Sequence, residues 1–291
     1  MKPNKLTKLS FIILAIILVL TIAATVISNV CIKLSEYTIK LSGLSGNAKV
    51  VVISDLHGKE YGKDNKQLLD KISEQKPDAI FVVGDMLSDS DAESGFSKTQ
   101  NLLFTLLDIA PVYLSYGNQE KEYSGDILDS FRKAITEKGV VVLDDSFVDC
   151  QIGGQELRIG ATMGHAFPFG RTKEEFENSD EYIFLKDMQE TDSPTIVLAH
   201  MPDTFIFNGA HNYWSNIDLV VSGHTHGGVI RLPVAGGIYA PMQGLFPEYD
   251  YGFYMLGEKM QMVITSGLSG YKFVPRFLNL PEICVLTLTG E

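Results

Sequence analysis

Five runs of aliphatic residues, each followed or closed by residue types that bind metals, constrain the fold of this chain more than any other feature. The runs cover residues 48–54, 79–84, 111–117, 195–200 and 217–223, and Gly, Pro or Asp flanks them. Runs of this kind are typical of buried β-strands. The polar residues at their ends are Asp55 and His57, Asp85, Asn118, His200, and His224 with His226.

These polar residues are expected to converge, although they are far apart in the sequence. In open α/β sheets, ligands bind in the crevice beyond the carboxyl ends of the strands. Carboxylates, an amide and imidazoles suit Mn, Fe, Zn or Mg better than a soft thiolate site, and none of the three cysteines belongs to the set. One carboxylate can bridge two cations about 3.5–4 Å apart, an arrangement that activates water for attack on phosphorus. The pattern predicts a two-metal site.

The ordered set of motifs resembles the calcineurin-like metallophosphoesterase superfamily over residues 48–288. The family pattern is D-x-H, GD, GNH[DE], H and GHxH. It is met by Ser54-Asp55-Leu56-His57, Gly84-Asp85, Gly117-Asn118-Gln119-Glu120, His200 and Gly223-His224-Thr225-His226. The tail RFLNLPEI at residues 276–283 resembles the membrane-anchored bacterial branch of the family.

The resemblance implies a role for each residue and a class of reaction. Asp55, His57 and His226 would hold the first metal. Asn118, His200 and His224 would hold the second, and Asp85 would bridge both. With two divalent ions as cofactors, the expected activity is hydrolysis of a phosphodiester or pyrophosphate bond, with Asn118, Gln119 and His200 as the catalytic residues that face the phosphate.

The fold class follows from the order of the elements. Strands alternate with helices at first, and the carboxyl half is rich in strands and glycine, which predicts an α/β fold with two sheets packed face to face between helices. The family resemblance implies the same four-layer αββα sandwich of two mixed sheets. Helices are expected at residues 66–74, 127–138 and 179–189, and a polar loop at residues 88–95.

Gln119 departs from the family pattern, in which His usually follows Gly-Asn. An amide donates a hydrogen bond but does not transfer a proton near neutral pH. Three alternatives follow: a slower enzyme for acidic leaving groups, an enzyme with a substitute acid, or a catalytically weak or inactive sensor that binds phosphate or phospholipid through its metals. His165 and then His211 are the candidates for a substitute acid. Glu120 is expected to orient its neighbours instead.

The amino terminus predicts a membrane anchor. Lys2, Lys5 and Lys8 precede an uncharged stretch at residues 9–32. About 20 apolar residues cross a hydrocarbon core about 30 Å thick, and this stretch exceeds the roughly 15 residues of a signal-peptide core. Residues 1–33 are therefore predicted to form a cytoplasmic stub and a transmembrane helix. Because the lysines favour the cytoplasm, residues 34–291 would form a metallophosphoesterase domain outside it. Cleavage within residues 21–30 is the alternative.

Composition narrows the partners. Acidic residues outnumber basic ones by 36 to 24, and no basic-aromatic stripe is present, which argues against nucleic acid. The expected partner is a phosphorylated small molecule or lipid. The aromatic segment at residues 239–254 has two interpretations: core packing, expected for members such as Phe253, or a site for an acyl or isoprenoid chain. A disulfide between Cys150 and Cys284 is left open by the sequence.

Overall fold

Two six-stranded sheets form the body of the computed structural model, which describes residues 5–87, 93–123, 126–164, 173–207, 209–271 and 274–290. The first sheet has the order β1-β16-β2-β3-β4-β5, and β16 is antiparallel to β2 while the other pairs are parallel. Its strands are β1 (Lys33–Lys40), β16 (Glu282–Thr289), β2 (Ala48–Ile53), β3 (Ala79–Val83), β4 (Val112–Ser115) and β5 (Val141–Leu143).

The second sheet has the order β14-β15-β9-β8-β7-β6. Its central pairs are parallel, and its two outermost pairs are antiparallel. The strands are β14 (Gly252–Leu256), β15 (Met260–Ile264), β9 (Leu219–Ser222), β8 (Thr195–Ala199), β7 (Gln155–Thr162) and β6 (Ser146–Ile152). Both sheets are mixed, so the predicted α/β class with mixed sheets is confirmed.

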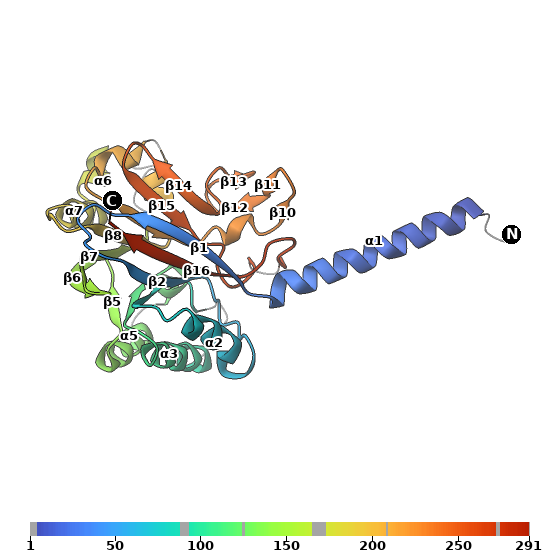
Figure 1. Ribbon diagram of the computed structural model, residues 1–291, viewed down its shortest axis with the longest axis horizontal. Coiled ribbons are helices and arrows are strands. Elements are labelled where there is room, and N and C mark those ends of the chain that lie inside the picture. The colour runs from blue at the N-terminus through green and yellow to red at the C-terminus, as the bar shows by residue number, and fades with distance from the viewer. Residues whose placement is uncertain are drawn as a thin grey trace.

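The two sheets face each other across a shared apolar core. Val50 and Val52 of β2 lie in one buried cluster with Ile196 and Leu198 of β8, because alternate side chains of a strand point to the same face. The outer face of the first sheet packs against α2 (Lys66–Glu74), α3 (Glu93–Leu107) and α5 (Asp126–Lys138). The outer face of the second packs against α7 (Asp180–Met188), α8 (Asp203–Ile206) and Trp214, which follows the short helix η2 (Ala210–Tyr213). Helix α6 (Lys173–Glu177) precedes α7. Figure 1 shows these helices outside the sheets.

Two predictions about local structure need correction. The predicted loop at residues 88–95 overlaps α3, which begins at Glu93, and residues 88–92 lie outside the described residues. The prediction that Phe253 packs in the core is wrong, because its side chain is 41% exposed. It lies on β14, an edge strand on which Leu256 is buried instead. The five predicted strands and the three predicted helices are confirmed to within about two residues at each end.

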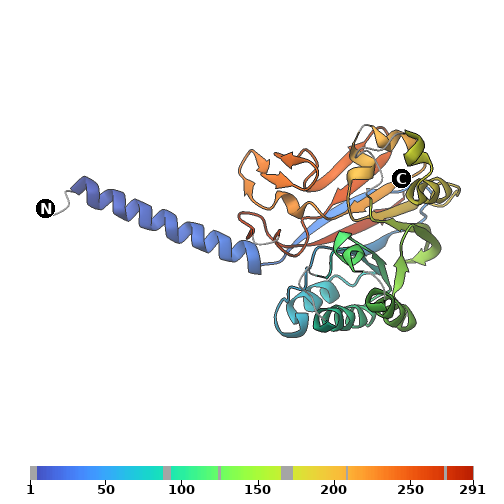
Figure 2. The same cartoon turned by 180° about the vertical axis from the view of Figure 1, so that it is seen from behind.

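A long amino-terminal helix, α1 (Lys5–Val30), projects away from the domain in Figures 1 and 2. It is long and apolar enough to cross a membrane, and its most apolar stretch has no buried residue. A signal sequence near the amino terminus can also be long and apolar enough to meet this description. Only Cys31 and Ile32 separate α1 from β1.

Two small hairpins follow the short helix η3 (His226–Gly228). The first pairs β10 (Arg231–Leu232) with β11 (Gly236–Gly237), and the second pairs β12 (Tyr239–Ala240) with β13 (Gly244–Leu245). Figures 1 and 2 both show the hairpins on the side of the domain from which α1 leaves.

Candidate metal centre

The fold brings together the strand ends that carry the predicted ligands. Asp55 follows β2 and Asp85 follows β3, and these two strands are parallel neighbours. Asn118 begins the short helix α4 (Asn118–Glu122) after β4, the next parallel strand. In the second sheet, β8 and β9 are parallel neighbours that lead to His200 and to the turn of His224 and His226. The carboxyl ends of strands from both sheets therefore supply the residues of the site.

Six of the seven predicted ligands form two compact groups. The Asp55 group contains Asp55, His57 and His226, and the Asp85 group contains Asp85, His200 and His224. Within each group, one potential ligand atom of every residue lies within 4.8 Å of the others.

Asp85 joins the two groups. Its Oδ2 atom lies 3.3 Å from Nε2 of His200 and 3.6 Å from Nε2 of His57. In the Asp55 group, Oδ1 of Asp55 lies 3.8 Å from Nε2 of His226. A carboxylate in contact with both groups has the position that a bridging ligand requires.

The unpaired polar atoms of the site fit divalent metals. Nε2 of His57, His200 and His224 and Oδ1 of Asn118 are buried and have no hydrogen-bond partner among the described residues. Buried polar atoms are normally paired. Backbone carbonyls fix the orientation of two imidazole rings of the site. Nδ1 of His200 lies 2.8 Å from the Val83 carbonyl oxygen, and Nδ1 of His226 lies 3.2 Å from that of Ser269. Metal-binding histidines are commonly oriented in this way.

Five of the seven predicted ligands have a strained backbone. The φ angles of Asp55, His57, Asp85, His224 and His226 are 53°, 47°, 53°, 68° and 49°. Non-glycine residues rarely adopt such angles, each costs on the order of 1–3 kcal/mol, and they cluster at functional sites. Hydrogen bonds between neighbouring turns hold the strained backbone, for example from Asp55 N to the Gly84 carbonyl and from His57 N to that of Asp85.

Two glycines leave space for these turns. A Cβ atom on Gly84 would lie 2.7 Å from Nδ1 of His200, and one on Gly117 would lie 2.1 Å from Oδ1 of Asp85. Both separations are far below van der Waals contact. Only glycine therefore allows the backbone to approach the ligands this closely.

Electrostatics favour the ligand forms of two side chains in the Asp85 group. Burial opposes ionisation of Asp85, but His200 and His57 outweigh it and hold the pKa of that carboxyl below its usual range. Burial, together with the positive charge of His200, lowers the pKa of His224 to about 3, so its imidazole is neutral. Burial also opposes protonation of His200, yet the Asp85 carboxylate raises the pKa of His200 to about 10.

Glu120 orients the backbone that carries Asp85. Its Oε2 accepts from the amides of Asp85 and Gly117, both at 2.8 Å, and its Oε1 accepts from those of Met86 and Leu87 at 2.9 and 3.0 Å. Burial raises the pKa of Glu120. With both oxygens engaged, Glu120 has the orienting contacts that were expected of it.

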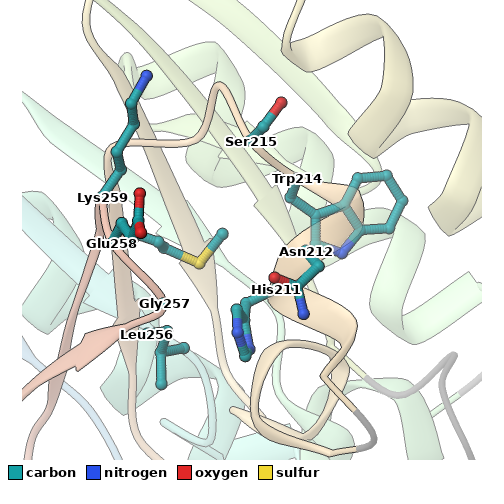
Figure 3. Close-up of a pocket in the computed structure, with 9 residues that line it drawn as sticks. His211, Asn212, Trp214, Ser215, Leu256, Gly257, Glu258 and Lys259 are labelled. Atoms are coloured by element: carbon teal, nitrogen blue, oxygen red, sulfur yellow. The ribbon is translucent and has the colours of Figure 1, made fainter.

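Gln119 lies next to Asp85, and its side-chain oxygen has no hydrogen-bond partner among the described residues. Its backbone amide donates to Oδ1 of Asp85 at 2.9 Å, and its side-chain Oε1 is buried without a partner among the described residues. Of the two candidate substitute acids, His165 lies outside the described residues. His211 lines a pocket with Trp214 and Glu258, shown in Figure 3, and no residue of the two metal-binding groups lines that pocket.

Arg276 and Asn279 contribute to the site although their sequence pattern predicted no role for them. The fully buried Arg276 guanidinium donates to the Ser269 carbonyl and, at 2.7 Å, to that of Ser266. Asn279 Nδ2 donates to the His226 carbonyl at 2.8 Å and to that of Val229 at 3.1 Å. These contacts support the turn that carries His226. Both residues belong to the tail motif at residues 276–283, which in the sequence indicated only a family resemblance.

Residues 48–228 match the family model for calcineurin-like phosphoesterases. The chain belongs to the calcineurin-like phosphoesterase family. It is similar to an uncharacterized metallophosphoesterase of Campylobacter jejuni, with 27% identity over 98% of this chain and 70% of the relative. It is also similar to phosphodiesterase YaeI of Escherichia coli, with 26% identity over 82% of each chain. UDP-2,3-diacylglucosamine pyrophosphatase LpxG of Chlamydia muridarum is 26% identical over 84% of each chain. The family and these names identify a metal-dependent phosphoester hydrolase.

Proposed function

We propose that this chain is a dinuclear metal-dependent phosphohydrolase that cleaves a phosphodiester or pyrophosphate bond in a lipid or cell-envelope molecule. The observation that carries the proposal is the pair of adjoining groups, together with three imidazole nitrogens and one amide oxygen of the predicted ligands that are buried and have no hydrogen-bond partner among the described residues. The names of the phosphodiesterase and pyrophosphatase relatives support the type of bond. The second of these names supports a lipid-linked substrate.

Each residue has a distinct task in this proposal. Asp55, His57 and His226 hold one ion; Asn118, His200 and His224 hold the other; Asp85 contacts both. Bound divalent ions neutralise charge that develops on the phosphoryl oxygens and lower the pKa of water. The amide of Asn118 and the imidazole of His200 orient the phosphate. Gln119 donates a hydrogen bond towards the leaving oxygen, but it supplies no proton.

Elemental analysis combined with turnover tests the proposal. Full-length protein purified in detergent with Mn is expected to hold about two ions per chain and to hydrolyse bis-p-nitrophenyl phosphate. A metal content near zero under Mn-replete conditions would contradict the dinuclear centre. Full metal loading without turnover of any ester would favour the sensor alternative.

We propose further that residues 1–33 anchor the chain and that residues 34–291 form the catalytic domain outside the cytoplasm. The lysines before the apolar helix support this orientation. Protease added to intact protoplasts is expected to digest the domain. Protection until the membrane is broken would mean the opposite orientation, and a mature amino terminus within or after residues 21–30 would mean a cleaved signal.

A further inference from the structure

The two hairpins after η3 expose several large apolar side chains. Val234 at the tip of the first hairpin is fully exposed, and Leu245 and Phe246 of the second are 70% and 61% exposed. Together with neighbouring exposed residues they form the hairpin surface, which comprises Leu232, Val234, Met242, Leu245, Phe246 and Leu278. Exposed apolar groups gathered in one region mark contact with a membrane or with another protein.

Leu278 belongs to this surface because its segment pairs with the first hairpin. Ile230 forms a parallel bridge with Phe277, and the Arg231 amide donates to the Phe277 carbonyl at 3.0 Å. The chain around Phe277 thus lies beside the hairpins. The same segment also contacts the end of α1.

The end of α1 is hydrogen-bonded to that segment. Asn29 Nδ2 donates to the Arg276 carbonyl at 2.9 Å, and the Arg276 amide donates to Oδ1 of Asn29 at 3.3 Å. Lys59, two residues after His57, donates through Nζ to the Asn29 carbonyl. Only two residues lie between α1 and β1, so no flexible linker lets the domain move away from the helix end.

The length of α1 places a membrane surface close to Asn29. Its uncharged part within the helix, residues 9–30, spans about 33 Å at 1.5 Å per residue, close to the hydrocarbon thickness of about 30 Å. If residue 9 lies at one face of the hydrocarbon core, the opposite face lies near the last turn of the helix. The hairpin surface lies on this side of the domain in Figures 1 and 2.

We propose that the hairpin surface is a second membrane contact, whose apolar side chains enter the interface of the bilayer that α1 crosses. This inference rests on the proposed anchoring by α1. The bilayer is the occupant because backbone contacts of residues 276–278 connect the end of α1 to the first hairpin: Arg276 bonds to Asn29, and Phe277 bonds to Arg231. Ring contacts link it to the metal centre, since Tyr271 lies 5.5 Å from His226 and 5.8 Å from Tyr239 between ring centroids.

Tryptophan reporters in the full chain test this contact. Phe246→Trp and Val234→Trp each add an indole to the hairpin surface, and Phe147→Trp adds one to an exposed site on β6, at the opposite side of the domain. Trp214 is buried and gives the same background in every variant. Each protein is reconstituted in phosphatidylcholine vesicles with either normal or brominated acyl chains, and flotation establishes that it is anchored.

Brominated lipid is expected to remove about half or more of the added emission of Phe246→Trp and Val234→Trp, because interfacial side chains lie about 5–10 Å into the headgroup and acyl boundary. The emission of Phe147→Trp should not change. Quenching at one hairpin alone would restrict the membrane contact to that hairpin and still support it. If neither reporter is quenched more than Phe147→Trp, the inference is wrong, and shielding of both from aqueous iodide would then assign the surface to a second protein chain.

The readout separates this inference from the proposed function. Flotation reports on anchoring by α1, lipid quenching reports on the hairpin surface, and turnover of bis-p-nitrophenyl phosphate reports on the metal centre. A chain that floats and hydrolyses the diester without lipid quenching overturns the membrane contact alone. A chain that shows quenching without turnover retains the contact and contradicts the hydrolase.

Discussion

The Asp85 group and the Asp55 group of the metal centre are supported by different parts of the chain. Around Asp85, support comes from strand ends, since Glu120 binds four backbone amides and His200 faces the Val83 carbonyl. Around His226, support comes from Arg276 and Asn279 in the segment that also binds Asn29 of α1. One group is thus held by the sheet core, and the other by contacts that continue to the proposed membrane anchor.

This difference indicates which substitutions should affect one ion and which should affect both. A residue that joins the groups has the largest consequence. A residue that supports one group should weaken one ion and leave the other in place. Contacts between the helix and the domain should affect stability before they affect chemistry.

Asp85→Asn is expected to affect both groups, because the carboxylate contacts His200 and His57. Loss of the shared negative charge should reduce turnover by about four orders of magnitude, equivalent to about 5–6 kcal/mol of transition-state stabilisation. Metal content should fall below one ion per chain. Turnover and elemental analysis measure both effects, and Asp149→Asn at an exposed carboxylate is the control. Retention of one full ion would assign Asp85 to a single group.

Gln119→His should accelerate hydrolysis, because it restores a group that can protonate the leaving oxygen. The gain should reach about 100-fold to 10,000-fold for alkyl diesters and be much smaller for nitrophenyl diesters, whose leaving groups need no proton. Rates normalised to metal content measure it. Equal rates for both ester classes in the native protein, unchanged by the substitution, would instead indicate a substitute acid.

Arg276→Lys should weaken the Asp55 group alone. Lysine retains the charge but cannot reproduce the guanidinium contacts beneath the His226 turn. We expect one of the two ions to lose affinity by about 10–100-fold while the other is retained. Competition titration with a chelator measures the two affinities, and Arg158→Lys at a surface ion pair serves as the control. Equal loss from both sites would contradict separate support.

Asn29→Ala should have the smallest effect. It removes two hydrogen bonds between α1 and the Arg276 backbone, which should lower the free energy of unfolding by about 1–3 kcal/mol. Thermal unfolding in detergent is the measurement. The matched control is Asn178→Ala, because among the described residues the Asn178 side chain bonds to the Glu174 carbonyl of its own turn alone. An unchanged midpoint would mean that the helix end contributes nothing to the stability of the domain.

The sequence was informative where the pattern is local. Five buried strands and the helix at residues 66–74 were predicted from runs and spacing, because a continuous aliphatic run indicates a strand buried on both faces and helical spacing indicates the buried face of a helix. The predicted orienting role of Glu120 matches its four amide contacts. Helix α3 was not predicted: Gly95 and polar residues precede its apolar part, and burial against Phe131 of α5 compensates for their weak helix propensity.

Non-local pairing was beyond the reach of these patterns. β1 and β16 pair although they lie at opposite ends of the domain's sequence, and the sequence of neither strand indicates its partner. Phe253 was assigned to the core because it is aromatic, yet β14 is an edge strand with one face in solvent. The pairing of strands, which depends on packing over the whole domain, decides such cases.

The sequence by itself determined the chemistry of the centre, because the residue types that bind hard cations are written in short motifs that close aliphatic runs. It also determined the apolar helix, because a long continuous segment of apolar residues indicates directly that its surroundings are apolar. The family resemblance implied that Asp85 bridges the two groups, and the structure places its carboxylate beside both. Only the tertiary structure showed that Arg276 supports the His226 turn. It alone placed Asn29 and the hairpins on the same side of the domain, because contacts between residues hundreds of positions apart depend on how sheets, turns and helix pack together.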